Sequence, residues 1–367
     1  MGERNNTVLK RLDRYIGSPL LYALGAFRTS RPYKALPENP RIMVLKTAAI
    51  GDTILMEAVL HEIKHAYPKS QITFVCSKCN MAMVKTLPQV DQVVCFEMKE
   101  PFASLQAIRG LGHFDLLLDF APWARINGVI SWVADAAFKV GFKRRHMYRH
   151  YVYDVAVEHS DHVHEMDNYR AILKAAHIPV QGFNPQLATD QAVHLPFEKF
   201  VVFHLFPGGS SVDLRIWAFD NWIALGARLY ETYGLPILVT GGPEDAGAAM
   251  TLVDALHGVG VQAQSIAGAY PLRDMPSVLH KAQLVVSVNT GILHMSAAAD
   301  VPLIALHGAT SVTRWGPLSE KAQVIWSGED CQPCISLGFE SDCQDVKCMR
   351  NITVDRVMQA VDTVLGH

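Results

Sequence analysis

The sequence predicts an α/β protein, and three observations support this fold class. The chain has 367 residues, which is typical of two domains or of one large α/β unit. Half of the residues are hydrophobic and 19% are charged, a composition that excludes bulk disorder. Short apolar runs alternate with helix-period stretches, and this alternation begins twice, near residues 41 and 200. Such a pattern is typical of βαβ units around parallel sheets.

The first series of elements follows residue 40. Its expected strands cover residues 42–45, 72–75, 90–96 and 116–118, and its clearest helix covers 54–67. Residues 141–198 are rich in His, Tyr and polar residues and show little periodicity before 169–176. Prolines and a glycine then interrupt regular structure near 180–198. We therefore expect a first domain over residues 41–190.

A second series begins at residue 200. Its expected strands cover 200–205, 236–240, 284–288, 303–306 and 324–326, and its expected helices cover 219–233, 245–256 and 293–299. These elements predict a second α/β domain over residues 191–350. The last stretch has the periodicity of an amphipathic helix. We expect residues 351–367 to form a C-terminal helix that packs back towards the first domain.

The charge of the chain is unevenly distributed. The net charge is −2 at pH 7, so no global field attracts nucleic acid and we expect no such partner. Residues 1–38 hold seven Lys and Arg against three acidic residues, so this head carries +4 and the remainder −6. We treat residues 1–40 as a basic N-terminal extension.

Apolar and basic side chains in this extension follow helical spacing over residues 8–16, which predicts an amphipathic segment. The charge-free stretch 15–27 is too short and too broken by Gly17 and Pro19 to span a membrane. No convincing A-x-A site marks a signal peptide. We expect either peripheral contact with the cytoplasmic face of a membrane or a helix packed on the body or on a partner.

Asp52 is the main candidate for a catalytic residue. Residues 44–53 read as a strand, a small-residue turn and the start of a helix. Ligands of open α/β sheets bind at the carboxyl ends of strands, so a carboxylate here is placed to act as a general base on a bound hydroxyl. Capping of the helix explains the same residue equally well.

Three loops of the second half also follow expected strands and suit a phosphate. Glycines let backbone N–H groups approach an anion, an arginine can bind phosphate oxygens, and a helix N-terminus favours negative charge. A carboxylate there suits ribose hydroxyls. Because these loops share one sheet edge, they predict a diphosphate-bearing ligand. The candidate residues are Gly208, Ser210, Arg215, Glu244, Asn289, Thr290, Gly291 and His294.

Five features of the sequence occur together: the turn from Lys46 to Asp52, the Pro207-Gly208 pair, Trp217, the run from Asn289 to Ala299 and the tail ending in Cys348-Met349. On these features the chain resembles, over residues 41–366, the ADP-heptose:lipopolysaccharide heptosyltransferases and their relatives in glycosyltransferase family 9. This resemblance implies the GT-B architecture, in which two Rossmann-like domains with mostly parallel sheets face each other across a cleft. It also implies that the first domain handles the acceptor, that the second binds the donor, and that the anomeric carbon is inverted.

The resemblance implies a role for each matching residue. Asp52 is similar to the family's catalytic base. Arg215 stands where a phosphate-binding Lys is usual, and Asn289 stands where an Asp that binds donor sugar hydroxyls is common. Thr290, Gly291 and His294 match and would contact the diphosphate, whose charge grows as it leaves.

The implied donor is ADP-heptose, and the implied acceptor is a lipopolysaccharide core or a similar lipid-linked glycan. We expect Lys46, Arg144 and Arg145 to contact this acceptor. The scheme requires no cofactor, and no metal-binding Asp-x-Asp occurs. A cytoplasmic enzyme beside the inner membrane would fit. The alternatives are a nucleotide-sugar epimerase of the same architecture and a non-catalytic binding protein.

Two further motifs offer competing interpretations. Residues 61–65 match the H-E-x-x-H pattern of zinc metallopeptidases, although helical spacing places both histidines on the flank of the helix. Near the C-terminus, four cysteines suit the thiolate ligands of a structural zinc, and plain thiols are the equal alternative. These cysteines are Cys331, Cys334, Cys343 and Cys348. The odd total of seven cysteines and a nucleotide substrate favour a reducing compartment over disulfides.

Overall fold

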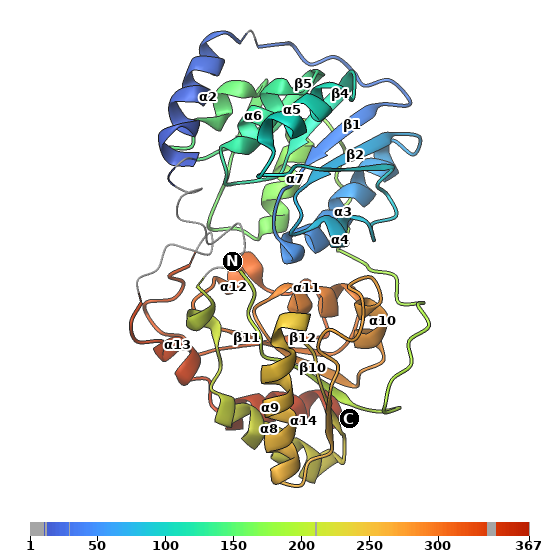
Figure 1. Cartoon of the computed structure of the whole chain (residues 1–367), viewed down its shortest axis with the longest axis vertical. Helices are drawn as coiled ribbons and strands as arrows, with labels where there is room; N and C mark the ends of the chain where they lie inside the picture. The colour runs from blue at the N-terminus through green and yellow to red at the C-terminus, as the bar shows by residue number, and fades with distance from the viewer. Residues whose placement is uncertain (1–10, 12, 29, 210, 336–342, 367) are drawn as a thin grey trace. The chain divides into compact units, whose positions relative to one another are not determined.

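The computed structural model describes residue 11 and residues 13–28, 30–209, 211–335 and 343–366. The chain divides into two compact units, Met1–Asn184 and Pro185–His367. In Figure 1 the first unit runs from blue to green and the second from green to red. The division lies within the junction expected at 180–198, slightly before the expected boundary at residue 190.

The first unit contains a six-stranded parallel sheet in the order β3-β2-β1-β4-β5-β6. β1 and β4 are neighbours although they are not consecutive, so the connections on their two sides run in opposite directions. The gap between their carboxyl ends is therefore the topological switch point, where open α/β sheets bind ligands. The strands are β1 (Arg41–Leu45), β2 (Gln71–Cys76), β3 (Gln92–Cys95), β4 (Phe114–Asp119), β5 (Ala136–Lys143) and β6 (Val155–Glu158).

Helices cover this sheet, and alternate side chains of each strand meet them. Met43, Leu45 and Leu117 form one core cluster with Ile108 of α5 and Ile130 of α6. α7 contacts both α3 and β5. The helical elements are α3 (Ile50–Ala66), α4 (Met81–Val84), α5 (Pro101–Arg109), α6 (Ile126–Val133), α7 (Glu165–Ala175) and the 3₁₀ turn η2 (Arg149–Val152).

The N-terminal segment includes helix α2 (Gly17–Ala26), which packs on the first unit. Leu21 is fully buried against Val152 and Tyr153. Gly25 lies so close to Tyr151 that an added Cβ would come within 2.4 Å of its side chain. Packing on the body, one of the two expectations for this segment, is thus what the structure shows for α2. Among the described residues, no helix combines the length and apolar character needed to cross a bilayer.

The second unit contains another six-stranded parallel sheet, in the order β12-β11-β10-β7-β8-β9. Its switch point lies between β7 and β10. The strands are β7 (Val201–His204), β8 (Ile237–Val239), β9 (Ala263–Ser265), β10 (Leu284–Val288), β11 (Leu303–His307) and β12 (Ala322–Trp326). The two-domain α/β prediction is confirmed, with both sheets wholly parallel.

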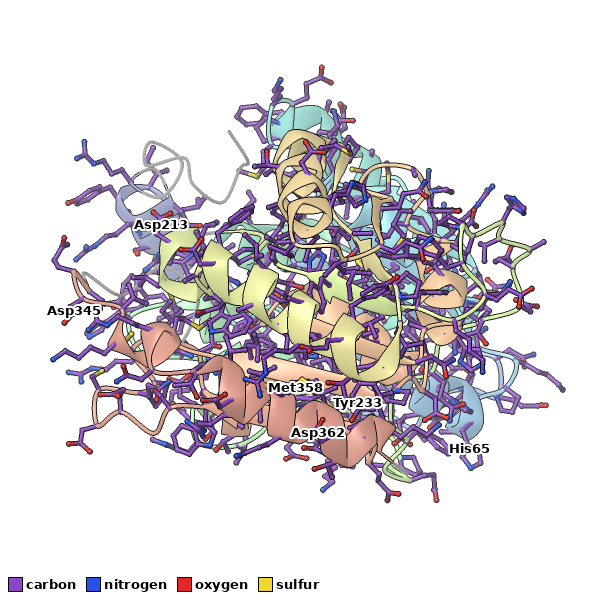
Figure 2. All side chains as sticks on the ribbon, turned by 90° about the horizontal axis from the view of Figure 1, so that it is seen from below. His65, Asp213, Tyr233, Asp345, Met358 and Asp362 are labelled. Carbon is purple, nitrogen blue, oxygen red and sulfur yellow. The ribbon has the colours of Figure 1, made fainter. Side chains whose placement is uncertain are left out.

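The C-terminal helix α14 belongs to the second unit. Met358 and Val361 are buried in the core cluster that contains Trp222 of α8, and Tyr233 Oη donates to Asp362 Oδ1 over 2.8 Å. Figure 2 shows Tyr233 and Asp362 side by side on the two helices. The buried face of this helix thus belongs to the core of the second unit. Packing of the helix towards the first domain stays a prediction. The helices are α8 (Phe219–Tyr233), α9 (Ala246–Gly258), α10 (Met275–His280), α11 (Gly291–Ala298), α12 (Val312–Trp315), α13 (Lys347–Arg350) and α14 (Val354–Leu365).

Candidate active site

Asp52 lies in the first turn of α3, directly after the carboxyl end of β1. Its side chain is 13% exposed, so it is enclosed but reachable. Its Oδ2 lies 3.4 Å from the backbone N–H of Ala49, at the helix N-terminus. A carboxylate here is favoured by the helix dipole. The expected position after the carboxyl end of a strand is thus observed, together with a partial capping role, and this strand borders the switch point of the first sheet.

Two groups converge on Oδ1 of Asp52. The Lys46 ammonium lies 2.7 Å from it, and the Tyr169 hydroxyl donates a hydrogen bond of 2.9 Å to it. Lys46 is only 1% exposed and also donates to the backbone carbonyl of Phe120. The expectation that Lys46 binds the acceptor is therefore wrong, because its charged end is enclosed beneath Asp52.

The basic residues that follow β5 are mostly paired. Arg144 binds both carboxylate oxygens of Asp161, over 2.9 and 2.7 Å. Arg149 is buried, where it forms an ion pair with Asp119 and donates a hydrogen bond to the Tyr153 hydroxyl. The sequence alone does not distinguish it from a surface arginine. Arg145 is exposed at this edge of the sheet. Acceptor contact by Arg145 stays a prediction, and for Arg144 it would compete with Asp161.

Arg215 joins the two loops that flank the switch point of the second sheet. Its guanidinium donates to the carbonyl of Gly208, after β7, over 2.6 Å and to the carbonyl of Asn289, after β10, over 3.2 Å. Arg215 ends the short turn η3 (Val212–Arg215), which returns the chain to these loops. Ser210 lies outside the described residues. The arrangement brings a cation and an exposed glycine, Gly208, to one place.

The loop after β10 positions the remaining donor candidates. Thr290 caps α11, since its hydroxyl accepts the Ile292 N–H over 3.1 Å, and Gly291 is the first residue of the helix. Asn289 is 8% exposed, and its amide nitrogen lies 3.2 Å from Nε2 of His307. His294 is buried in the same helix. These residues therefore meet at a helix N-terminus, as predicted.

Glu244 lies apart from this group in the turn after β8. Its side chain is exposed, whereas the neighbouring Asp245 accepts the Gly242 N–H over 2.8 Å. Burial raises the pKa of Asp245. Asp245 thus shapes the turn, and Glu244 is the carboxylate that a ligand can reach.

Histidine side chains at the strand ends were not among the predicted site residues. His307, at the end of β11, is fully buried, and burial followed by repulsion from His294 lowers its pKa to about 3. His204, at the end of β7, bonds with the hydroxyl of Thr240 over 3.0 Å, and burial lowers its pKa to about 4. Both are neutral at pH 7. The sequence signal that could have indicated them is their position as the last residues of two strands, at the sheet edge where ligands bind.

The H-E-x-x-H pattern has a structural explanation. Glu62 is fully buried and accepts the backbone N–H groups of Gln181, Gly182 and Phe183 over 2.7 to 3.1 Å. His61 stacks on the Phe183 ring, with centroids 4.2 Å apart. A glutamate used in this way is unavailable as a general base, so the peptidase interpretation is wrong.

The four cysteines near the C-terminus differ in their surroundings. Cys331 is exposed, whereas Cys348 is buried, and Cys334 and Cys343 pack at the border of the core of the second unit. Burial, followed by repulsion from the nearby Cys334 and Cys331, raises the pKa of Cys348 to about 11.

The structure also bears on the zinc interpretation of these cysteines. Within the described part of the chain, which includes all four, no three His, Cys, Asp or Glu side chains are placed to hold a metal ion. None of the seven cysteines of the chain forms a disulfide. The structural zinc site at Cys331, Cys334, Cys343 and Cys348 stays a prediction, beside the alternative of plain thiols.

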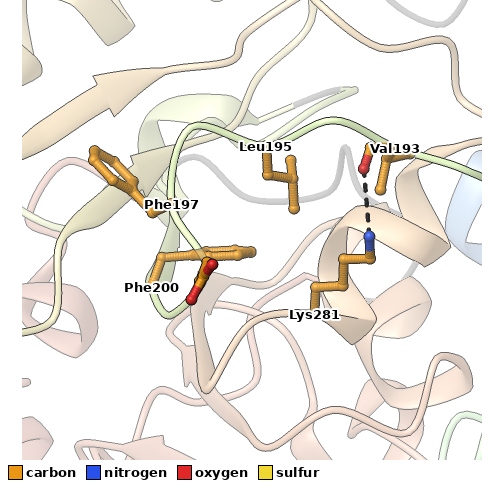
Figure 3. A pocket seen from close by; sticks show the side chains of 6 residues that line it. Val193, Leu195, Phe197, Phe200 and Lys281 are labelled. Carbon is orange, nitrogen blue, oxygen red and sulfur yellow. Dashed lines mark hydrogen bonds between the residues drawn. The ribbon is translucent and has the colours of Figure 1, made fainter.

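A pocket of about 330 Å³ lies elsewhere in the second unit. Figure 3 shows it between the segment that precedes β7 and Lys281, whose ammonium donates to the Val193 carbonyl. Phe200 and Lys281 come before β7 and β10, so the pocket is at the amino ends of the strands. It is therefore separate from the loops that carry the donor candidates.

Comparison with known proteins agrees with this arrangement. The chain is 21% identical to the lipopolysaccharide core heptosyltransferase OpsX of Haemophilus influenzae, over 78% of this chain and 85% of that protein. It is 22% identical to lipopolysaccharide heptosyltransferase 2 of Salmonella typhimurium, over 78% and 87%.

Solved structures show the same fold. A family 9 glycosyl transferase from Veillonella parvula superposes with a TM-score of 0.72 at 18% identity, over 89% of this chain and 97% of that one. Escherichia coli heptosyltransferase WaaC with ADP gives a TM-score of 0.68 at 18% identity, over 88% and 99%. The fold is thus that of the GT-B heptosyltransferases. The model of glycosyltransferase family 9 (heptosyltransferase) matches residues 111–343, which is more than half of the chain. The chain therefore belongs to this family of glycosyltransferases.

Proposed function

We propose that the protein transfers heptose, or a related sugar, from an ADP-linked donor to a lipopolysaccharide core or a similar lipid-linked glycan. The observation that carries the proposal is the carboxylate of Asp52, held at the switch point of the first sheet in a family 9 chain. Relatives named as lipopolysaccharide heptosyltransferases, and a relative solved with ADP-2-deoxy-2-fluoro heptose, support the choice of substrates.

The reaction is a single displacement. Asp52 takes the proton of the acceptor hydroxyl while the hydroxyl oxygen forms a bond to the anomeric carbon of the donor sugar. The bond from that carbon to the phosphate oxygen breaks, and the electron pair leaves with ADP. Attack opposite the leaving group inverts the anomeric carbon. Arg215 and the N-terminus of α11 supply positive charge to the departing diphosphate.

The test of this mechanism is the Asp52→Asn variant. Asparagine keeps the shape and a capping oxygen but cannot take the proton, so kcat falls about 10²- to 10⁴-fold. Stabilisation of the protein by ADP serves as the control and stays unchanged, because Asp52 belongs to the acceptor unit. Wild-type transfer by Asp52→Asn would exclude Asp52 as the base. The same assay separates transfer from epimerisation, which converts donor without acceptor, and from binding alone.

We also propose that the enzyme is cytoplasmic and meets the inner membrane through its N-terminal segment. Tyr15, Ile16, Tyr22 and Phe27 are exposed there, Phe27 at 83%, and Arg14 is exposed beside them. Aromatic side chains suit the membrane interface, and arginine suits anionic headgroups.

Vesicle co-sedimentation tests this contact. A Tyr22→Ser, Phe27→Ser double variant should bind vesicles that contain anionic lipid several-fold more weakly than wild type. Phe102→Ser is the matched control, because Phe102 is an 86% exposed aromatic on α5, outside the segment. Equal losses in both proteins would argue against a specific role of the N-terminal segment.

A further inference from the structure

Lys46 is a buried charge whose partners define its role. A buried ammonium is costly unless it is paired and hydrogen-bonded. Here its Nζ lies 2.7 Å from Asp52 Oδ1, donates over 2.7 Å to the Tyr169 hydroxyl, and donates over 3.1 Å to the Phe120 carbonyl. Phe120 follows β4, the strand across the switch point from β1. Lys46 therefore ties the Asp52 carboxylate to both strands of the switch point.

Tyr169 adds a second fixed contact from a third element. It lies on α7, is fully buried, and its ring meets Phe120 edge-on with centroids 5.6 Å apart. Its hydroxyl accepts a hydrogen bond from Lys46 and donates one to Asp52 Oδ1. The direction of both hydrogen bonds is fixed, because a lysine ammonium can only donate and the Tyr169 hydroxyl then donates its own proton to Asp52. Asp52 Oδ1 is held by two donors whose own positions are fixed by packing.

A second group of the same composition lies at the end of β4. Asp119 binds Arg149, and it accepts a hydrogen bond of 2.5 Å from the Tyr153 hydroxyl. Asp119 is fully buried, however, whereas the Asp52 side chain is 13% exposed. The same combination of carboxylate, cation and phenol therefore occurs twice in one sheet, and only the group around Asp52 can meet a substrate.

We propose that Lys46 and Tyr169 are positioning residues that keep Asp52 ionised and in one orientation for proton transfer. The proposal rests on the proposed role of Asp52 as base. An adjacent cation and a hydrogen bond to the charged form both favour the carboxylate. Lys46 and Tyr169 keep their own protons throughout, while the acceptor proton passes to Asp52. Their contribution is orientation, and a displacement of about 1 Å at a reacting group can cost about 100-fold in rate.

The experiment compares Tyr169→Phe with Tyr153→Phe. Each change removes one buried hydroxyl that donates to a carboxylate, so the cost in stability is matched. We expect kcat to fall about 10- to 100-fold in Tyr169→Phe, with the acceptor KM nearly unchanged, and to stay within about two-fold in Tyr153→Phe. If the Lys46→Met variant folds, its kcat should be lower still. If this variant does not fold, the comparison of Tyr169→Phe with Tyr153→Phe still tests the proposal.

A double-mutant cycle distinguishes a failure of the proposed base, Asp52, from a failure of the positioning role of Tyr169. If Tyr169 acts through Asp52, Tyr169→Phe lowers the residual rate of Asp52→Asn no further. Wild-type transfer by Asp52→Asn would overturn the proposed base itself. A slow Asp52→Asn enzyme combined with a fast Tyr169→Phe enzyme would overturn the positioning role alone. Independent, multiplicative losses in the double variant would also overturn it.

Discussion

His204 and His307 are two buried imidazoles in the second unit whose charged forms are excluded by burial. Their pKa values are lowered to about 4 and about 3, whereas an unfolded histidine titrates near about 6.5. As the pH falls below this value, the unfolded chain takes up protons that the folded chain does not. Stability from these groups is therefore complete above about pH 6.5 and is lost as the pH falls towards 4 and then 3.

This linkage predicts a specific acid sensitivity. Between pH 7 and about pH 4.5, His204 alone should account for a loss of about 2 kcal/mol in the free energy of unfolding. In His204→Gln, measured by urea denaturation at both pH values, that part of the pH dependence should vanish. His162→Gln, at an exposed position, should keep it. Identical pH dependence in wild type and His204→Gln would contradict the assignment.

At the level of single residues, the sequence predicted where a side chain lies along a strand or helix better than which partners it contacts. The position of Asp52 followed from one local pattern, a strand followed by a small-residue turn and a helix. The burial of Lys46 could not be predicted, because its partner Tyr169 is 123 residues away in the chain. The ion pairs of Arg149 and Arg144 could not be predicted for the same reason, since Asp119 and Asp161 meet them only in the folded chain.

The surroundings of the four cysteines near the C-terminus could not be predicted for a related reason. A C-x-x-C pair followed by two more cysteines is compatible with a zinc site, but spacing does not fix the direction of a side chain. In the folded chain Cys348 is buried in the core of the second unit, whereas Cys331 is exposed. Only tertiary packing decides this difference.

At the level of elements, Glu62 of α3 fixes the end of the first unit. Its buried carboxylate accepts three consecutive backbone N–H groups, and Arg170 donates to the Phe183 carbonyl at the same place. A charged acceptor makes strong hydrogen bonds with backbone N–H groups. The H-E-x-x-H match therefore reflects an anchor for a loop.

Glu62→Ala should remove the buried acceptor that three consecutive backbone N–H groups share. We expect the free energy of unfolding to fall by about 3 kcal/mol, and by less in Glu62→Gln, which retains one acceptor oxygen. Chemical denaturation measures both values. Glu231→Ala, at an exposed position on α8, serves as the control and should change stability by less than about 0.5 kcal/mol. A loss in Glu62→Ala no greater than this control would contradict the anchor.

Elements with continuous apolar runs were predicted, and those without were missed. β5 was missed because Lys139 and Gly141 interrupt its apolar residues, and β6 because it is a sheet edge with only partly buried side chains. The amphipathic pattern of α14 predicted a helix with one buried face. It could not predict the partner of that face, which is a matter of tertiary packing.

At the level of the whole molecule, each unit has its own core. Among the described residues, the cluster around Trp217 and Trp222 draws on residues from 201 to 365, and the cluster around Leu45 draws on residues from 43 to 136. A unit with its own sheet and core can fold by itself. The donor candidates all belong to the second unit.

The fragment 185–367 should therefore fold and bind ADP on its own. At about 100 times its dissociation constant, ADP should add about 2.7 kcal/mol to the stability of the fragment. Circular dichroism and thermal unfolding with and without ADP measure this, and fragment 1–184 is the control that should show no ADP effect. Stabilisation of the full chain without stabilisation of fragment 185–367 would contradict the assignment of the nucleotide to this unit.

The anchoring of the chain on both sides of the division also has a consequence for protein engineering. Phe183 is fixed in the first unit by Glu62, and the Leu187 N–H donates to the Ala298 carbonyl in the second. Only residues 184–186 lie between these points, and the chain passes from one unit to the other once. A gene crossover within these codons would exchange complete halves between family members. If the acceptor binds the first unit and the donor the second, as proposed, such hybrids would recombine acceptor choice and donor choice independently.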